Sequence, residues 1–322
     1  GGDQSNDAAG ESGAVYIYTR EGTTWTFQEY LKASNTTADD QFGWSLAIDG
    51  DTLAVGANYE GSLATGVGAD QTNDSELARR GAVYIFSRTA DQWSQTEYIK
   101  SSNTLAGRFG DQLVMQGDTL VVGSPFEGSA ATGINGDQQL TGGGGSGAVY
   151  VFRRNGIAWT QTDSIKSSNT ESGDRFGAAL AFDSDTLVVG APAEASGATG
   201  VDGDQSDNRA SYAGAAYVFK RTGDTWTQEA YLKASNTQID GVPNNDSFGF
   251  RVGIVGDLIA VGAFWEDGGA LGLNGPDNDD AFQAGAVYLF SRSNTMWSPT
   301  SYLKTTVSGG RQFSRSCLLY TS

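Results

Sequence analysis

Apolar and polar residues along this chain follow patterns that suit short β-strands. The run Val149-Tyr150-Val151-Phe152 is apolar at every position, which predicts a strand covered on both faces. A later run, Trp226 to Ala234, alternates Trp or Tyr with polar residues and predicts an outer strand with one edge toward solvent. Helical apolar periodicity does not persist beyond a few residues anywhere. The pattern therefore predicts an all-β protein.

The same pattern recurs at a nearly constant period. The tetrapeptide G-A-V-Y, or its variant G-A-A-Y, recurs in steps of 68, 66, 67 and 71 residues at Gly13, Gly81, Gly147, Gly214 and Gly285. A Phe-Gly pair, a Trp and a segment similar to Y-L-K-A-S-N recur with the same period. Because several independent anchors share one period, we interpret the chain as a tandem repeat array.

Each unit divides into four predicted strands. In one copy they are Phe176 to Asp183, Thr186 to Ala191, Ala215 to Arg221 and Trp226 to Ala234. Asp49-Gly50 marks the link between the first two strands of another copy and predicts a type I′ hairpin turn. About two dozen Gly-, Asp- and Asn-rich residues separate the second strand from the third. Four strands, covered on both faces and repeated every ~67 residues, predict a β-propeller blade with one long loop.

The array contains about 4.5 predicted blades. The half blade spans 1–36, the full blades span 42–104, 109–170, 176–237 and 248–304, and 305–322 departs from the repeat and is predicted not to be native.

The repeat carries a family resemblance. F-G-x-x-L-A at Phe176 to Ala181, followed by L-V-V-G-A-P at Leu187 to Pro192, resembles the FG-GAP repeat of integrin α-chain propellers, and the long-loop type is similar to that of bacterial secreted or cell-surface proteins. The resemblance implies a propeller, usually of seven blades, so this chain is predicted to be a fragment of a larger ring. We predict a non-enzymatic scaffold, extracellular or on the cell surface, for adhesion or for binding a protein or glycan. The resemblance also implies a D-x-D-x-D-G calcium loop, from which this chain departs, because only a tight turn such as Asp49-Gly50-Asp51 stands there.

Composition narrows the function. The net charge of −18, from 38 acidic and 20 basic residues, repels phosphate backbones and argues against nucleic acid as a partner. The absence of His removes the commonest general base and metal ligand, and the single Cys317 provides no disulfide framework. No apolar run approaches the roughly 18 residues of a membrane span.

A recurring set of acidic residues predicts calcium in the long loops. A Glu follows the second strand of each full blade, and an Asp follows it ten or eleven residues later. Together with two more carboxylates of the loop at 199–207, the predicted ligands are Glu60, Asp70, Glu127, Asp137, Glu194, Asp202, Asp204, Asp207, Glu266 and Asp277. Calcium prefers oxygen ligands on flexible backbone, and such a loop would bind it with a Kd on the order of 10⁻⁴–10⁻³ M. The alternative is that each Asp forms a turn and each Glu is a cap or a solvated charge.

Three other residue types recur. A Lys on the outermost strand is interpreted as protection against edge-to-edge aggregation, with a binding stripe as the alternative: Lys32, Lys100, Lys166, Lys233 and Lys304. The recurring Trp is predicted to pack between blades and hairpins, with a carbohydrate-stacking platform as the alternative. A glycine in each second strand predicts close approach of another backbone: Gly56, Gly123, Gly190 and Gly262.

Two other functions remain open from the sequence. A propeller hydrolase or lyase acting on polysaccharide needs carboxylates at a set separation, and its site could lie in the missing part of the ring. A catalytic site should occur once among the blades, whereas the acidic positions of this chain repeat. Repetition favours a scaffold for multivalent binding, with a purely structural spacer as the third possibility.

Overall fold

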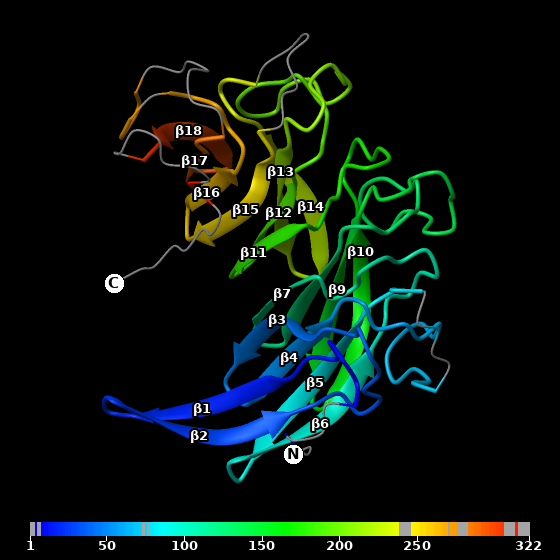
Figure 1. Cartoon of the computed structure of the whole chain (residues 1–322). Helices are drawn as coiled ribbons and strands as arrows, with labels where there is room; N and C mark the ends of the chain where they lie inside the picture. The colour runs from blue at the N-terminus through cyan, green and yellow to red at the C-terminus, as the bar shows by residue number, and fades with distance from the viewer. Residues whose placement is uncertain are drawn as a thin grey trace. The chain divides into compact units, whose positions relative to one another are not determined.

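The computed structural model describes residues 4, 8–72, 75, 78–237, 246–269, 271–275, 283–305 and 313–314. Every regular element in this part of the chain is a strand, and the strands form one two-stranded and four four-stranded antiparallel sheets (Figure 1). The predicted all-β class with four-stranded, blade-like sheets is confirmed. No helix that is long and apolar enough to cross a membrane occurs in the described part.

The strands follow the chain order within each sheet. The two-stranded sheet consists of β1 (Val15–Glu21) and β2 (Thr24–Leu31). The first four-stranded sheet consists of β3 (Phe42–Asp49), β4 (Thr52–Ala57), β5 (Ala82–Thr89) and β6 (Gln92–Ile99). The second consists of β7 (Gln112–Gln116), β8 (Thr119–Ser124), β9 (Ala148–Asn155) and β10 (Ala158–Ile165). The third consists of β11 (Ala179–Asp183), β12 (Thr186–Ala191), β13 (Ala215–Thr222) and β14 (Thr225–Leu232). The fourth consists of β15 (Phe248–Val255), β16 (Leu258–Ala263), β17 (Ala286–Ser293) and β18 (Met296–Leu303).

The chain forms two compact units. One consists of Gly1–Glu127 and Val149–Ser164, and the other of Gly128–Ala148 and Ile165–Ser322. The first unit therefore holds β1 to β8 and nearly all of β9 and β10, and the second holds β11 to β18.

The middle strands of each sheet form the core. All six residues of β4, β8 and β12 are buried, and so are the first five residues of β5, β9 and β13. Both faces of these strands are covered, which explains why their sequences are apolar without alternation. The outer strands β6, β10 and β14 alternate exposed with more buried positions before ending in a buried pair or triplet.

The tight turn between the first two strands differs from its prediction. Asp49 pairs with Thr52, so the two loop residues are Gly50 and Asp51, and of these only Gly50 has a positive φ, of 56°. A type I′ turn requires positive φ at both loop residues, whereas type II′ requires it at the first alone. The predicted type I′ turn is therefore wrong, and the φ values fit type II′.

Two sets of glycines allow one sheet to approach the next. Gly81, the first residue of a G-A-V-Y tetrapeptide, has a φ of 79°, and a Cβ there would lie 2.1 Å from the carbonyl oxygen of Phe109. Gly56, in a second strand, lies so close to Gly110 that its Cβ would be 2.2 Å from that carbonyl oxygen. Gly190 has the same relation to Gly249, at 2.0 Å. The predicted close approach in the second strands is confirmed at Gly56 and Gly190, and the neighbour is the Phe-Gly strand of the following sheet.

In each full sheet the recurring Trp lies beside an ion pair, close to the two-residue turns. In the third sheet the guanidinium of Arg221 lies 5.5 Å from the ring centroid of Trp226, and its Nη2 lies 2.9 Å from Oδ1 of Asp185. Arg88, Arg154 and Arg292 form the same arrangement in the other sheets. The four Trp residues involved are all at least 94% buried, which confirms their predicted packing role, whereas Trp25 of the two-stranded sheet is 64% exposed.

Candidate functional site

Each full sheet has two unlike ends. Because antiparallel strands follow one another in chain order, successive connections alternate between the ends of the sheet. One end, the turn end, carries only two-residue hairpin turns. The other, the loop end, carries the long loops 58–81, 125–147, 192–214 and 264–285 together with the connections between sheets. The predicted calcium ligands all belong to these long loops.

The recurring Glu closes the base of its loop. In the first full sheet the N–H of Glu60 donates to the carbonyl of Ala57, and the Glu60 carbonyl accepts the N–H of Gly81 at 2.9 Å. One residue therefore ties the end of β4 to the start of β5. Glu194 and Glu266 accept the equivalent glycine N–H, from Gly214 and Gly285. The backbone of the Glu fixes both ends of the long loop, and this places its side chain inside the sheet edge.

The side chain of this Glu lies in a buried polar network. In the third sheet, Oε2 of Glu194 accepts from Nζ of Lys233 at 2.9 Å, and both side chains are at most 1% exposed. Oε1 accepts from the hydroxyl of Tyr231 at 2.9 Å and from Nδ2 of Asn169 at 2.9 Å. Both carboxylate oxygens are therefore hydrogen-bonded, as a buried charge requires.

The network recurs in the first and fourth sheets. Nζ of Lys100 lies 2.5 Å from Oε2 of Glu60, and the Tyr98 hydroxyl donates to Oε1 at 2.7 Å. Lys304 and Tyr302 contact Glu266 in the same way. The second sheet departs from this set, because a buried Ser164 stands where the others have Tyr.

The Asn of the network comes from the preceding sheet. Asn35 follows β2, yet its Nδ2 donates to Glu60 at 3.0 Å and its Oδ1 accepts from the Tyr84 hydroxyl at 2.6 Å. Asn169 and Asn236 make the same two contacts with the sheets that follow them. In the second sheet, Asn103 donates to Glu127. Each amide thus joins the end of one sheet to the loop base of the next.

The structure overturns the prediction for the recurring Lys. Lys100, Lys166, Lys233 and Lys304 are all at least 96% buried, so they neither line an exposed edge nor form a binding stripe. Each of these Lys residues comes one residue after its outermost strand, at the start of the segment that follows the sheet. The alternative that each Glu is a solvated charge is also wrong, because all four are at most 1% exposed.

Burial shifts the ionisation of the groups around Glu194. It lowers the pKa of Lys233, with the Glu194 carboxylate acting in the opposite direction. Burial raises the pKa of the Tyr231 phenol, and the Glu194 carboxylate raises it further. The phenol therefore stays a hydrogen-bond donor at any ordinary pH.

A second buried carboxylate precedes the Phe-Gly pair. Asp174 is 3% exposed and accepts the Glu171 N–H at 2.9 Å. Burial raises its pKa to about 7, the bond to Glu171 opposes this, and the nearby Glu194 carboxylate adds to it. Asp40 holds the same place in the first sheet, where it accepts from Thr37. The sequence analysis missed these carboxylates.

The predicted Asp ligands lie apart from the Glu residues and bind their own loop. Asp70 accepts from the N–H and hydroxyl of Thr72, and Asp204 accepts in the same way from Ser206. These hydrogen bonds lower the pKa of each carboxyl. Such contacts two residues onward are typical of turn-forming Asp residues.

The remaining predicted ligands are also held by the protein. Asp137 accepts the Gln139 N–H, Asp207 pairs with Arg209, and Asp202 accepts the Tyr231 N–H. Asp277 lies outside the described residues. No group of three or more His, Cys, Asp or Glu that could hold a metal occurs within the described part of the chain. Each of these described Asp carboxylates is held within the fold, and calcium stays a prediction.

Comparison with known proteins places the chain in a family. Three segments match the family model described as FG-GAP repeat, at residues 25–86, 159–219 and 226–290, together more than half of the chain. The chain belongs to the FG-GAP repeat family. The first FG-GAP match begins in β2 and ends in β5, so the repeat spans two neighbouring sheets and includes the Asn35–Glu60 contact that joins them.

Other comparisons add little to the FG-GAP assignment. None of the curated proteins matches the sequence. Among solved structures, the chain is similar to one from the S. cerevisiae complex of Dbp5 with Nup159, Gle1, IP6 and ADP, at 9% identity and a TM-score of 0.40. The likeness covers 87% of this chain and 50% of that chain, so this chain spans half the length of that structure. A score this low supports no inference about fold or function.

Proposed function

We propose that this FG-GAP chain is a non-enzymatic scaffold, located outside the cell or on its surface, that binds an extracellular protein or glycan through the loop ends of its blades. The supporting observation is that the recurring charged residues are used within the fold. Glu60, Glu194 and Glu266 each have a buried Lys partner, and their backbones hold the long loops in place. A role for the chain must then come from what the loops present.

The long loops present different exposed side chains in each sheet. Large exposed apolar residues in them include Leu63, Leu140, Tyr212 and Leu273. Loops on a rigid scaffold that vary in surface chemistry are the usual place for binding residues. Partly apolar loops within an acidic surface suit a protein or a neutral glycan better than an anionic partner.

The repeated carboxylates are poor candidates for catalysis. A glycosidase needs one carboxylate to donate a proton and a second to act as nucleophile or base at a set separation. Glu194 already accepts from an ammonium, a phenol and an amide, so both of its carboxylate oxygens are occupied by groups of the fold. This occupation supports a scaffold over a hydrolase.

Loop variants and turn-end variants test the proposal. The wild-type chain is screened against arrays of glycans and extracellular proteins, and the best ligand is titrated. The exposed loop residues Leu140 and Tyr212 are changed to Ser, and the exposed turn-end residues Ile157 and Met296 are changed to Ser as matched controls. Loss of binding in the loop variants alone is the expected result. Binding lost only in the turn-end variants, or release of reducing ends from a polysaccharide, contradicts the proposal.

The loop calcium prediction is tested separately from the ligand. Thermal melts are recorded in millimolar Ca²⁺ and in excess chelator, because an ion bound only by the folded chain raises its Tm. A Tm that rises with Ca²⁺ and rises less in Asp204→Ala supports the prediction. An identical Tm in both conditions contradicts it and leaves Asp204 as a turn residue.

A further inference from the structure

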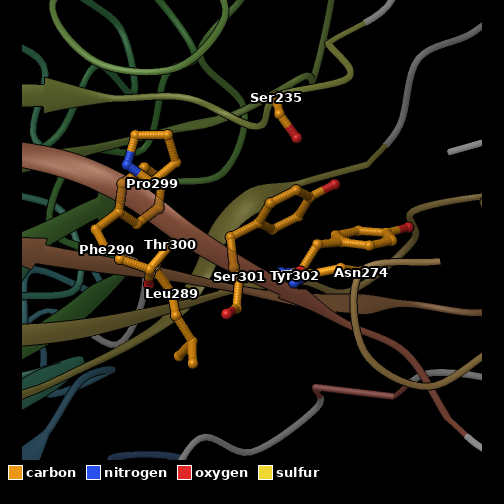
Figure 2. Close-up of a pocket in the computed structure, with 9 residues that line it drawn as sticks. Ser235, Asn274, Leu289, Phe290, Pro299, Thr300, Ser301 and Tyr302 are labelled. Carbon is orange, nitrogen blue, oxygen red and sulfur yellow. Dashed lines mark hydrogen bonds between the residues drawn. The ribbon is translucent and has the colours of Figure 1, made fainter. Parts of the chain in front are cut away.

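The fourth sheet contains a small pocket beside its outermost strand. It has a volume of about 220 Å³ and is lined by residues of β17 and β18, by Asn274 of the long loop and by Ser235 of the connection from the preceding sheet. Figure 2 shows Ser235 across from the strand that carries Pro299 and Ser301. The pocket lies between neighbouring sheets of one compact unit, and the loop end supplies part of its wall.

A single residue difference distinguishes the pocket wall of this sheet from the same place in the first and second sheets. In the first and second sheets a Gln of the outer strand reaches the preceding connection. Gln95 Nε2 donates to the hydroxyl of Ser34, and Gln161 Nε2 donates to that of Ser102, each at 2.9 Å. The fourth sheet has Pro299 at this position, because Pro299 pairs with Phe290 as Gln95 pairs with Phe86. Proline has no side chain that could reach Ser235, so the space between the sheets stays open.

Proline is tolerated here because β18 is an outermost strand. A central strand would lose a ladder hydrogen bond to proline, whereas an edge strand keeps its inner pairing. The register of β17 and β18 shifts at Leu289 and Phe290, next to the proline. The first sheet has the same irregularity with Gln95 in place, so the shift alone does not open the space.

The pocket wall combines aromatic rings with neutral polar groups. Tyr288 and Tyr302 lie with their ring centroids 4.9 Å apart, and Phe290 lies beside them. The hydroxyls of Ser235 and Ser301 belong to the same wall, and none of the described lining residues carries a charge. These three aromatic side chains are at most 9% exposed, so the accessible wall consists mainly of the exposed Pro299 ring and neutral polar groups, which suit a ligand with C–H faces and many hydroxyl groups.

Asn274 provides a positioned donor. Its N–H donates to the Tyr302 carbonyl, and its Oδ1 accepts the Tyr302 N–H, both at 2.8 Å. With Oδ1 occupied in this way, the amide NH₂ is left to contact a ligand. The third sheet has Asp202 at the same position with the same two backbone bonds, so the fourth sheet replaces a carboxylate with a neutral donor.

We propose that this pocket, defined by Ser235, Asn274, Pro299 and Ser301, binds one neutral sugar residue of a glycan. The inference rests on the proposed function, and it names the ligand class and a place for it. At about 30 Å³ per water molecule in the liquid, the pocket holds the volume of roughly seven waters, well below that of sites for drug-sized ligands. One monosaccharide unit fits this size, and its Kd is expected to be on the order of millimolar.

Restoring the glutamine provides the direct test. Pro299→Gln is expected to fill the pocket as Gln95 does in the first sheet, and to keep the strand intact. Saturation-transfer NMR is recorded with glucose, galactose, mannose and N-acetylglucosamine, and with glucuronate as a charged comparison. Wild type is expected to give a signal with at least one neutral sugar, and Pro299→Gln is expected to reduce it at least tenfold. Met296→Ser, an exposed change on the same strand, is expected to leave it unchanged.

A second variant keeps the test decisive if Pro299→Gln does not fold. Asn274→Asp preserves both backbone bonds, as Asp202 shows, but removes the NH₂ donor and adds a charge. It is expected to weaken the sugar signal several-fold without lowering Tm. The proposed sugar site is wrong if no neutral sugar gives a signal with wild type, or if both variants give the same signal as wild type. If Leu140→Ser abolishes binding to the array ligand but Pro299→Gln does not change it, the proposed sugar site is wrong while the proposed function is supported.

Discussion

The buried pair of Glu194 and Lys233 gives the sharpest prediction about stability. Both side chains are at most 1% exposed and their charged atoms are 2.9 Å apart. With an effective dielectric constant of about 20, the attraction between them is about 6 kcal/mol, and much of this offsets the cost of removing both charges from water. Removing one partner leaves the other charge buried without compensation. Glu194→Gln and Lys233→Met are each expected to lower the free energy of unfolding by about 3–5 kcal/mol.

The double variant separates the charge pair from the rest of the network. Gln at position 194 still offers an oxygen to the Tyr231 hydroxyl and the Asn169 amide, and Met at position 233 fills the space of the Lys stem. Glu194→Gln with Lys233→Met is therefore expected to cost only about 1–2 kcal/mol, far less than the sum of the two single changes.

Urea unfolding, followed by Trp fluorescence and by circular dichroism, measures these differences. A shift in midpoint with an unchanged m-value reports a change in stability. Asp118→Asn, which breaks the partly exposed pair with Arg154, is the control and is expected to cost at most about 1 kcal/mol. Single variants that each cost under about 1 kcal/mol, or a double variant equal to their sum, refute the reasoning.

Two further predictions concern Asp174 and the close glycines. The pKa of Asp174 is raised to about 7 from 3.8, so its contribution to stability is fully present below pH 4 and is lost as the pH rises to 7. Asp174→Asn, which can still accept the Glu171 N–H, is expected to stabilise the chain by about 2–4 kcal/mol at pH 8. Urea titrations of this variant are expected to show a smaller decline in the free energy of unfolding between pH 4 and 7. A decline as steep as that of wild type contradicts the prediction. Gly214→Ala would place a Cβ 2.1 Å from the Phe248 carbonyl oxygen and is expected to lower the free energy of unfolding by at least about 3 kcal/mol. At Gly223 φ is also positive, but no atom lies within 4 Å of the added Cβ, so Gly223→Ala is expected to cost about 1–2 kcal/mol. Equal midpoints for the two alanine variants in urea would show that the contact with Phe248 is relaxed without cost.

The sequence predicted the strands well because their signals are local. The second strand Thr186–Ala191 was predicted to the residue, and the third and fourth strands differ from their predictions by at most two residues at an end. The first strand of that sheet is shorter than predicted and begins at Ala179 instead of Phe176. Phe176 instead bridges to Gly147 of the preceding loop, a contact between segments that local patterning does not report.

The site was harder to predict because its partners are far apart in the chain. The period showed that Glu194 and Lys233 recur, but not that they meet, since 39 residues separate them. Each residue type alone suggested an exposed role, a calcium ligand or an edge charge. Their nearly constant separation of 38 to 40 residues was the available signal, because two opposite charges that recur together at a similar separation can pair in successive sheets. Asn169 recurs with the same period within the Y-L-K-A-S-N segment and was interpreted only as part of a motif.

Pro299 illustrates a different limit. It stands two residues after Trp297, whereas the three preceding full repeats have Gln two residues after Trp93, Trp159 and Trp226. What the Gln does becomes clear only from its contact with Ser34 of the preceding connection. Without that contact, a missing Gln does not imply an open space.

The most direct test of the central claim compares the loops with the buried pair. We infer that the repeated charges stabilise the fold and that ligands bind at the loop end. Affinity for the best array ligand is measured for the Leu140→Ser and Tyr212→Ser loop variant and for the Glu194→Gln and Lys233→Met variant, both under conditions where each is folded. We predict that the loop variant loses binding at unchanged Tm, while the variant without the charge pair binds as wild type does. Binding that depends on Glu194 and Lys233 but not on the loops would contradict the account.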